Sequence, residues 1–222
     1  MSELWPWLAL FGLGAYHGIN PGMGWLFAVA LALQEKRRDA IWRALLPIAI
    51  GHALATGLVI GLVEGIGVMV PHTIVRGLAA LALIAFGVYR LVRTRHPRWV
   101  GMCVGRRDLL VWSFLMASAH GAGLMLVPVV LGPSSTPHAA HVHQALAVRP
   151  TSASGAAALW DRPGLAGLAV GVHTLGYLLA MGLVAVVVYE KLGLALLRHA
   201  WINLDLLWAA ALVAAGIFTL VF

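Results

Sequence analysis

The strongest constraint in this sequence is a succession of six apolar segments, each long enough to cross a membrane. We place them at residues 4–34, 44–69, 75–92, 109–131, 164–189 and 204–222. About 20 apolar residues in an α-helix span the hydrocarbon core of a bilayer. Hydrophobic residues make up 61% of the 222 residues and charged residues only 10%. A soluble domain of this size could not bury so much apolar surface. The sequence therefore predicts one all-α integral membrane domain over residues 1–222.

Basic residues are concentrated in three of the five connections between these spans. The loops after the first, third and fifth spans contain 12 of the 15 Lys and Arg residues. In a six-span chain these loops share one side, and an excess of Lys and Arg marks the cytoplasmic side. We expect a multi-pass protein of a bacterial-type cytoplasmic (inner) membrane, with both termini outside, a basic cytoplasmic loop at about 93–108 and an outer loop at about 132–162. The net charge of +7 then reflects topology and contact with membrane lipids, and does not indicate nucleic-acid binding.

The two halves of the chain are similar in sequence. Residues 52–63 and 173–184 share six of twelve positions, and residues 78–92 and 207–221 share eight of fifteen without a gap. We therefore predict two repeats, at about 4–92 and about 109–222. Because each repeat has an odd number of spans, the second must enter the membrane from the opposite face. Inverted repeats of this kind are common in secondary transporters, whose substrate site lies near the bilayer midplane.

Four histidines lie well inside the apolar spans, in two repeat-related pairs. His17 corresponds to His120, and His52 corresponds to His173. An ionisable side chain in the membrane interior is costly and usually faces a partner or an aqueous path. Each one alone is explained by a neutral imidazole bonded to a backbone carbonyl, whereas four at symmetric positions favour a shared site. Imidazole binds transition metals, carries protons and ligates haem iron.

The first span contains a helix breaker next to its histidine. Pro21 has no N–H, so the carbonyl of His17 is expected to lose its helical partner. Asn20 precedes proline and is excluded from helical geometry, and Asn followed by Pro suits the start of a new helix. We predict two half-helices, with freed carbonyls suited to a cation and a new N-terminus suited to an anion. The alternative is a packing kink that holds no ligand.

The motif His17-Gly-Ile-Asn20-Pro21-Gly-Met23 resembles the first-helix motif of the nickel/cobalt transporter families, including NicO-type efflux proteins, in the LysE-like exporter group. The form of that motif is His-x-x-Asp/Glu/Asn-Pro/Ala-Gly/Asp-His. The resemblance implies a three-plus-three helix plan, a histidine on the second helix, here His52, and transport of nickel or cobalt.

This chain departs from the family motif at two positions. Met23 stands where the family has its last histidine, and Asn20 occupies the acidic position. A thioether and the loss of a carboxylate favour softer ions such as Cu(I). His120 with Met125 nearby repeats the pattern loosely, although methionine is also an ordinary core-filling residue.

The leading hypothesis is a secondary transporter of a transition-metal cation (nickel, cobalt or copper), with protons as a candidate counter-ion. No nucleotide-binding motif is present, and a homo-oligomer or an additional subunit is compatible with this plan. The metal-site residues that the sequence predicts are His17, Asn20, Met23, His52, His120, Met125 and His173.

Two other functions stay open from the sequence alone. The four histidines supply axial ligands for haem b in an electron carrier. A LysE-like exporter of a small organic solute would hold a carboxylate at the half-helix N-terminus. We expect no enzyme, since no paired acid and base is apparent. In the outer loop, three histidines suit either metal capture or a variable linker, namely His138, His141 and His143.

Overall fold

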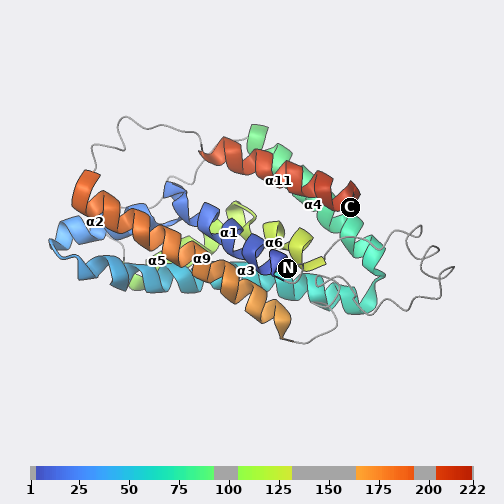
Figure 1. Ribbon diagram of the computed structural model, residues 1–222, viewed down its shortest axis with the longest axis horizontal. Helices are drawn as coiled ribbons and strands as arrows, with labels where there is room; N and C mark the ends of the chain where they lie inside the picture. Colours follow the sequence, from blue (N-terminus) through green and yellow to red (C-terminus); the bar gives the residue numbers. More distant parts are fainter. Residues whose placement is uncertain (1–3, 93–104, 132–163, 193–203, 222) are drawn as a thin grey trace.

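The computed structural model describes residues 4–92, 105–131, 164–192 and 204–221, and all regular structure in these ranges is helical (Figure 1). Helices α3, α4 and α9 are long and apolar enough to cross a membrane. The pair α5 and α6 adds a fourth span if the two are counted together. The helices are α1 (Trp5–Ile19), η1 (Pro21–Met23), α2 (Trp25–Glu35), α3 (Asp39–Met69), α4 (His72–Val92), α5 (Arg106–Ala119), α6 (Ala122–Leu131), α9 (Leu165–Val187), the π-turn η2 (Val188–Leu192) and α11 (Leu204–Val221).

The outer surface of the bundle is apolar, as a lipid environment requires. On α3, Leu54, Leu58 and Leu62 are spaced one turn apart and are each more than half exposed. Large leucines in such a stripe are unfavourable in water but match the hydrocarbon core of a bilayer. The structure therefore supports a membrane protein built of apolar helices.

The predicted break in the first span is confirmed. Helix α1 ends at Ile19, and Asn20 is extended, with a ψ of 123°. The Asn20 side chain accepts a 2.9 Å hydrogen bond from the Gly22 N–H and so caps the short turn η1. Gly24 has a φ of 131°, a conformation that favours glycine, and it turns the chain into α2. As predicted, Pro21 leaves the His17 carbonyl without its usual helical partner, but this carbonyl is not free, because the Asn20 N–H donates to it at 3.3 Å.

A second break, which the sequence did not predict, lies within the segment that we assigned as the span over residues 109–131. Helix α5 ends at Ala119, α6 begins at Ala122, and the two are bent by 57°. Gly121, with a φ of 67°, makes the corner. A Cβ at this position would also lie 2.9 Å from the ring of Phe86, so both backbone and space favour glycine. Each half of the chain thus has a broken first segment with a histidine beside the break.

Three helix pairs make the most extensive contacts: α1 with α9, α3 with α5, and α4 with α11. Figure 1 shows α4 and α11 side by side, apart from the remaining helices. At their crossing a Cβ on Gly87 would lie 3.0 Å from the Ala209 carbonyl, and a Cβ on Gly216 would lie 3.0 Å from the Ala80 carbonyl. Close approach through small residues is the usual basis of helix packing in membranes.

Replacing Gly216 with alanine should destabilise the protein about as much as replacing Gly87 with alanine, by roughly 1–3 kcal/mol each, because both methyl groups overpack one crossing. Thermal unfolding of the detergent-solubilised variants measures this. Gly57→Ala is the matched control for helix propensity, since nothing lies within 4 Å of a Cβ there. Equal stability of all three variants would refute this description of the crossing.

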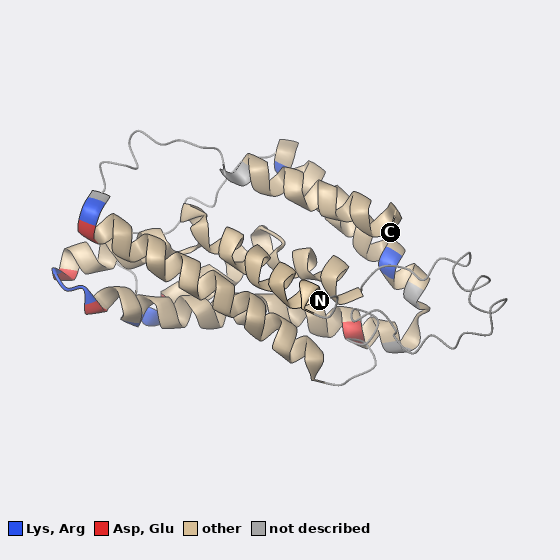
Figure 2. Cartoon of the chain, in the orientation of Figure 1, with Lys and Arg blue, Asp and Glu red and all other residues tan. Residues whose placement is uncertain are grey.

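Charged side chains gather at one end of the bundle, where α2 meets α3 and α9 ends (Figure 2). Arg38, in the first basic loop, forms a 2.9 Å ion pair with Glu190 of η2. The loops after the first and fifth predicted spans therefore lie at the same end, as expected from the distribution of basic residues. The expected outer loop, most of the loop at 93–108 and the three loop histidines lie outside the described residues.

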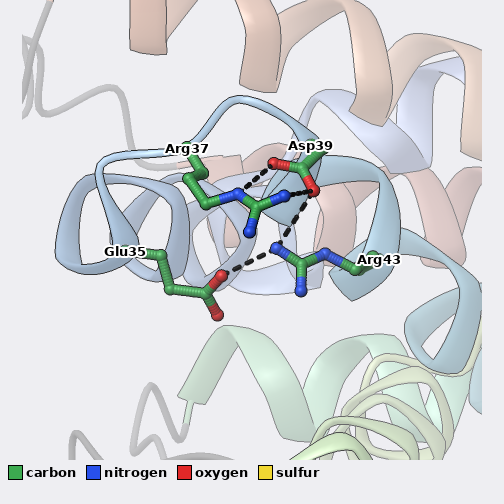
Figure 3. A network of polar contacts seen from close by, with 4 residues as sticks. All are labelled: Glu35, Arg37, Asp39 and Arg43. Carbon is green, nitrogen blue, oxygen red and sulfur yellow. Dashed lines mark hydrogen bonds and ion pairs between the residues drawn. The ribbon is translucent and has the colours of Figure 1, made fainter.

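A network of ion pairs closes the connection between α2 and α3 at this end (Figure 3). Arg43 binds both Glu35, at 2.8 Å, and Asp39, at 3.2 Å, while Arg37 binds Asp39 at 2.9 Å. Asp39 also lies in the first turn of α3, where a negative charge is favourable. These exposed pairs fix the loop geometry more than they stabilise the fold.

Candidate functional site

Three of the four predicted histidines converge at one buried point. His17 on α1, His52 on α3 and His173 on α9 are all fully inaccessible to solvent. Their ring centroids are 5.0 Å apart for His17 and His52, 5.4 Å for His52 and His173, and 6.2 Å for His17 and His173. We call these three residues the histidine cluster. It lies one turn before the break that ends α1.

Most ring nitrogens of the histidine cluster have no hydrogen-bond partner in the described part of the chain. Both nitrogens of His17, both of His52 and Nε2 of His173 are buried and unpaired. Leaving a buried polar group unpaired costs about 1–3 kcal/mol, so native proteins rarely do so without a reason. Five such atoms in one place therefore make the histidine cluster the candidate site for a ligand of the imidazole lone pairs.

The one paired nitrogen of the cluster orients its ring. Nδ1 of His173 lies 3.3 Å from the carbonyl oxygen of Leu10 on α1. A carbonyl only accepts, so Nδ1 carries the proton and Nε2 presents its lone pair to the interior. Metal-binding histidines are commonly held in this way by a second hydrogen bond.

Two aromatic residues that the sequence analysis missed form walls of the cluster. The Tyr177 ring stacks on His52 with centroids 4.0 Å apart, and the Trp208 ring meets His17 at 4.3 Å. The Tyr177 hydroxyl donates to the carbonyl of Met23, which ties α9 to the break. Tyr177 follows His173 by four residues, so helical spacing was a signal for it. No comparable signal pointed to Trp208.

His120 lies outside the histidine cluster and has its own partners. The side-chain Nη2 of Arg90 lies 3.1 Å from His120 Nε2, and His120 Nδ1 lies 2.9 Å from the carbonyl of Met116. Because a guanidinium only donates, Nε2 accepts and Nδ1–H donates to the carbonyl. The Trp208 indole N–H donates to the His120 carbonyl, so Trp208 lies between His120 and the cluster.

The other predicted site residues pack rather than face the imidazoles. Met23 is buried among the apolar residues of α2, α3 and α9, and Met125 is buried with Leu83, Trp208 and Leu212. Asn20 is committed to capping η1. The structure thus brings together His17, His52 and His173 of the seven predicted residues.

Two of the three ring separations in the histidine cluster, 5.0 and 5.4 Å, are close to those of imidazoles bound to one metal cation, whereas the third, 6.2 Å, is longer. Imidazoles bound to one tetrahedral metal, with metal–nitrogen bonds of about 2.0–2.1 Å, have centroids about 5 Å apart. Lone pairs lie in the ring plane, however, and the planes of His52 and His173 are nearly parallel, at 15°. As the side chains stand, no three His, Cys, Asp or Glu residues among those described form a metal site. A metal ion could be held by all three imidazoles only after their rings rotate.

Comparison with protein families, with curated proteins and with solved structures finds no match for this chain.

Proposed function

We propose that the protein is a secondary membrane transporter of a transition-metal cation, which binds at the histidine cluster. One observation carries the proposal: five ring nitrogens without a partner among the described residues lie together at a fully buried point where three apolar helices converge. Neutral imidazole is the commonest metal ligand among side chains, and it binds nickel, cobalt, copper and zinc. A buried site beside a broken helix is also the usual arrangement in secondary transporters.

We further propose six spans arranged as two inverted repeats, with α1–η1–α2 and α5–α6 as the two broken ones. In the proposed repeat, α1 corresponds to α5 and α3 corresponds to α9. The pair α1 and α9 therefore has the pair α5 and α3 as its counterpart, and both pairs pack extensively. Gly87 likewise corresponds to Gly216. Gly87 lies against Ala209 and Val213, and Gly216 lies against their repeat-related counterparts, Ala80 and Ile84. The later residue of α4 contacts the earlier part of α11 and the reverse, so the two helices are antiparallel, as expected for the third spans of two inverted repeats. Alternating access follows when one repeat rocks against the other.

The orientation and coupling belong to the same proposal. The charged end of the bundle faces the cytoplasm of a bacterial-type cell, and both chain termini lie outside. Protons are the counter-ion, because they compete with the metal for the imidazole lone pairs. The structure favours an organic carboxylate less, because the Gly22 N–H at the break, which such an anion would bind, already donates to the Asn20 side-chain oxygen.

Metal titration of the purified protein tests the proposal. We expect one cation per chain, and we expect His17→Ala and His52→Ala each to weaken binding about 100-fold or more, since each removes a ligand. Isothermal calorimetry with nickel, cobalt and silver salts gives the affinities. Elemental analysis and a visible spectrum of the purified protein complete the measurement.

His120→Ala is the control for loss of a buried histidine outside the cluster, and it should bind the cation as the unmodified chain does. Unchanged binding in both cluster variants would overturn the proposal. A Soret band lost in the same two variants would assign the imidazoles to haem instead.

A further inference from the structure

Three methionines surround the break in the first span, next to the histidine cluster. Met23 lies within the break, where its carbonyl accepts the Tyr177 hydroxyl. A Cβ at Gly22 would lie 3.9 Å from the methyl carbon of Met116, and a Cβ at Gly24 would lie 3.5 Å from the sulfur of Met181. The exposed fractions of Met23, Met116 and Met181 are 2%, 6% and 0%. We call these three residues the methionine collar.

Helix α9 connects the histidine cluster to the methionine collar. His173, Tyr177 and Met181 are spaced four residues apart, so they lie on one face of α9, and all three are fully buried. At a rise of about 1.5 Å per residue, Met181 is about 12 Å beyond His173 along the helix. The direction is toward Glu190 and the charged end of the bundle. The His173 imidazole and the Met181 thioether thus lie on one buried face of α9.

The described part of the chain offers no buried counter-charge for a divalent cation near this face. Among the described side chains no aspartate or glutamate is buried, and the buried polar groups are neutral or basic. The cost of moving an ion out of water rises with the square of its charge, so a divalent ion costs about four times as much as a monovalent one. Neutral imidazole and thioether donors also suit soft cations such as Cu(I).

We propose that the transported cation is monovalent and soft, with the chemistry of Cu(I) and Ag(I), and that it moves between the histidine cluster and the methionine collar. The inference rests on the proposed function and narrows its substrate class. The cation is two-coordinate or three-coordinate to imidazole at the cluster and to thioether at the collar. Met23, Met116 and Met181 are then ligands as well as packing residues.

Calorimetric competition on the purified, detergent-solubilised chain tests this with Ag(I), which is inert to oxidation, and with Ni(II) and Co(II). We expect Ag(I) to bind at least about 100-fold more tightly than either divalent ion. The triple variant Met23→Leu, Met116→Leu and Met181→Leu keeps the volume and removes the sulfurs, and it should weaken Ag(I) binding about tenfold or more. Met125→Leu is the matched control, because Met125 packs with Leu83, Trp208 and Leu212.

X-ray absorption of the unmodified protein loaded with Cu(I) gives a second measurement that needs no variant. We expect sulfur as well as nitrogen neighbours of the metal. Two results would refute metal binding by the methionine collar. One is a metal with nitrogen neighbours alone, and the other is an unchanged Ag(I) affinity in the triple variant. Tight Ni(II) or Co(II) binding that is lost in His17→Ala would refute the monovalent substrate while leaving the proposed function standing. If none of these metals binds, both the proposed function and this inference are refuted.

Discussion

Replacing Gly14 with valine should prevent the protein from folding to a stable, monodisperse state. A Cβ at Gly14 would lie 2.0 Å from the His173 carbonyl oxygen and 3.0 Å from the Tyr177 backbone nitrogen. Both obstacles are backbone atoms, so relief requires α1 and α9 to move apart. That movement would also separate the imidazoles of His17 and His173. We expect a loss of at least about 3 kcal/mol, measured as thermal stability and monodispersity in detergent.

Gly12→Val separates this clash from the general effect of valine in a helix. Gly12 lies two residues away on α1, and nothing lies within 4 Å of a Cβ there. The control variant should elute and unfold like the unmodified chain. A Gly14→Val protein as stable as Gly12→Val would show that α1 and α9 do not pack through this glycine.

Much of the fold was predictable because lipid imposes a simple pattern on sequence. Apolar length predicted α3, α4 and α9, and the three helices meet the requirements of a membrane span. The geometry of Asn before Pro predicted the end of α1 at Ile19, because proline affects the backbone locally. The clustering of basic residues placed Arg38 and Glu190 at the same end.

The second break was not predicted, because nothing in its local sequence forbids a helix. Glycine is common in membrane helices, and Gly121 resembles many glycines that stay helical. What excludes a side chain at this corner is the ring of Phe86, which lies beside it and comes from another helix. The repeat alignment offered a hint, since His120 and Gly121 correspond to His17 and Gly18.

The candidate site was predicted only in part, for a related reason. Periodicity shows that a histidine is inside a span, but not which way its ring turns. His120 is turned to Arg90 and Met116, whereas its repeat-related partner His17 joins the cluster. Trp208 completes the wall from the last helix, and contacts between segments so far apart in sequence have no local signature.

His52→Phe should stabilise the protein while abolishing cation binding. The His52 ring stacks on Tyr177 with centroids 4.0 Å apart and planes within 11°, a geometry that a phenyl ring also adopts. The substitution removes two buried nitrogens that have no hydrogen-bond partner in the described part of the chain. Removing unpaired buried polar groups is neutral or stabilising, and we expect a gain of about 1 kcal/mol here, with the slightly larger phenyl ring accommodated against Tyr177. Thermal unfolding and Ag(I) titration of the same preparation measure both effects.

His120→Phe is the opposite case and serves as the control. Its two ring nitrogens are bonded, to Met116 and to Arg90, so a phenyl ring would leave a carbonyl and a guanidinium without these partners. We expect a loss of about 1–3 kcal/mol with cation binding retained. A substitution at His52 that raises stability but abolishes cation binding is characteristic of a functional site, where unpaired ring nitrogens are kept for a ligand. If His52→Phe were as destabilising as His120→Phe, the cluster nitrogens would have structural partners, and the metal site would lose its physical basis.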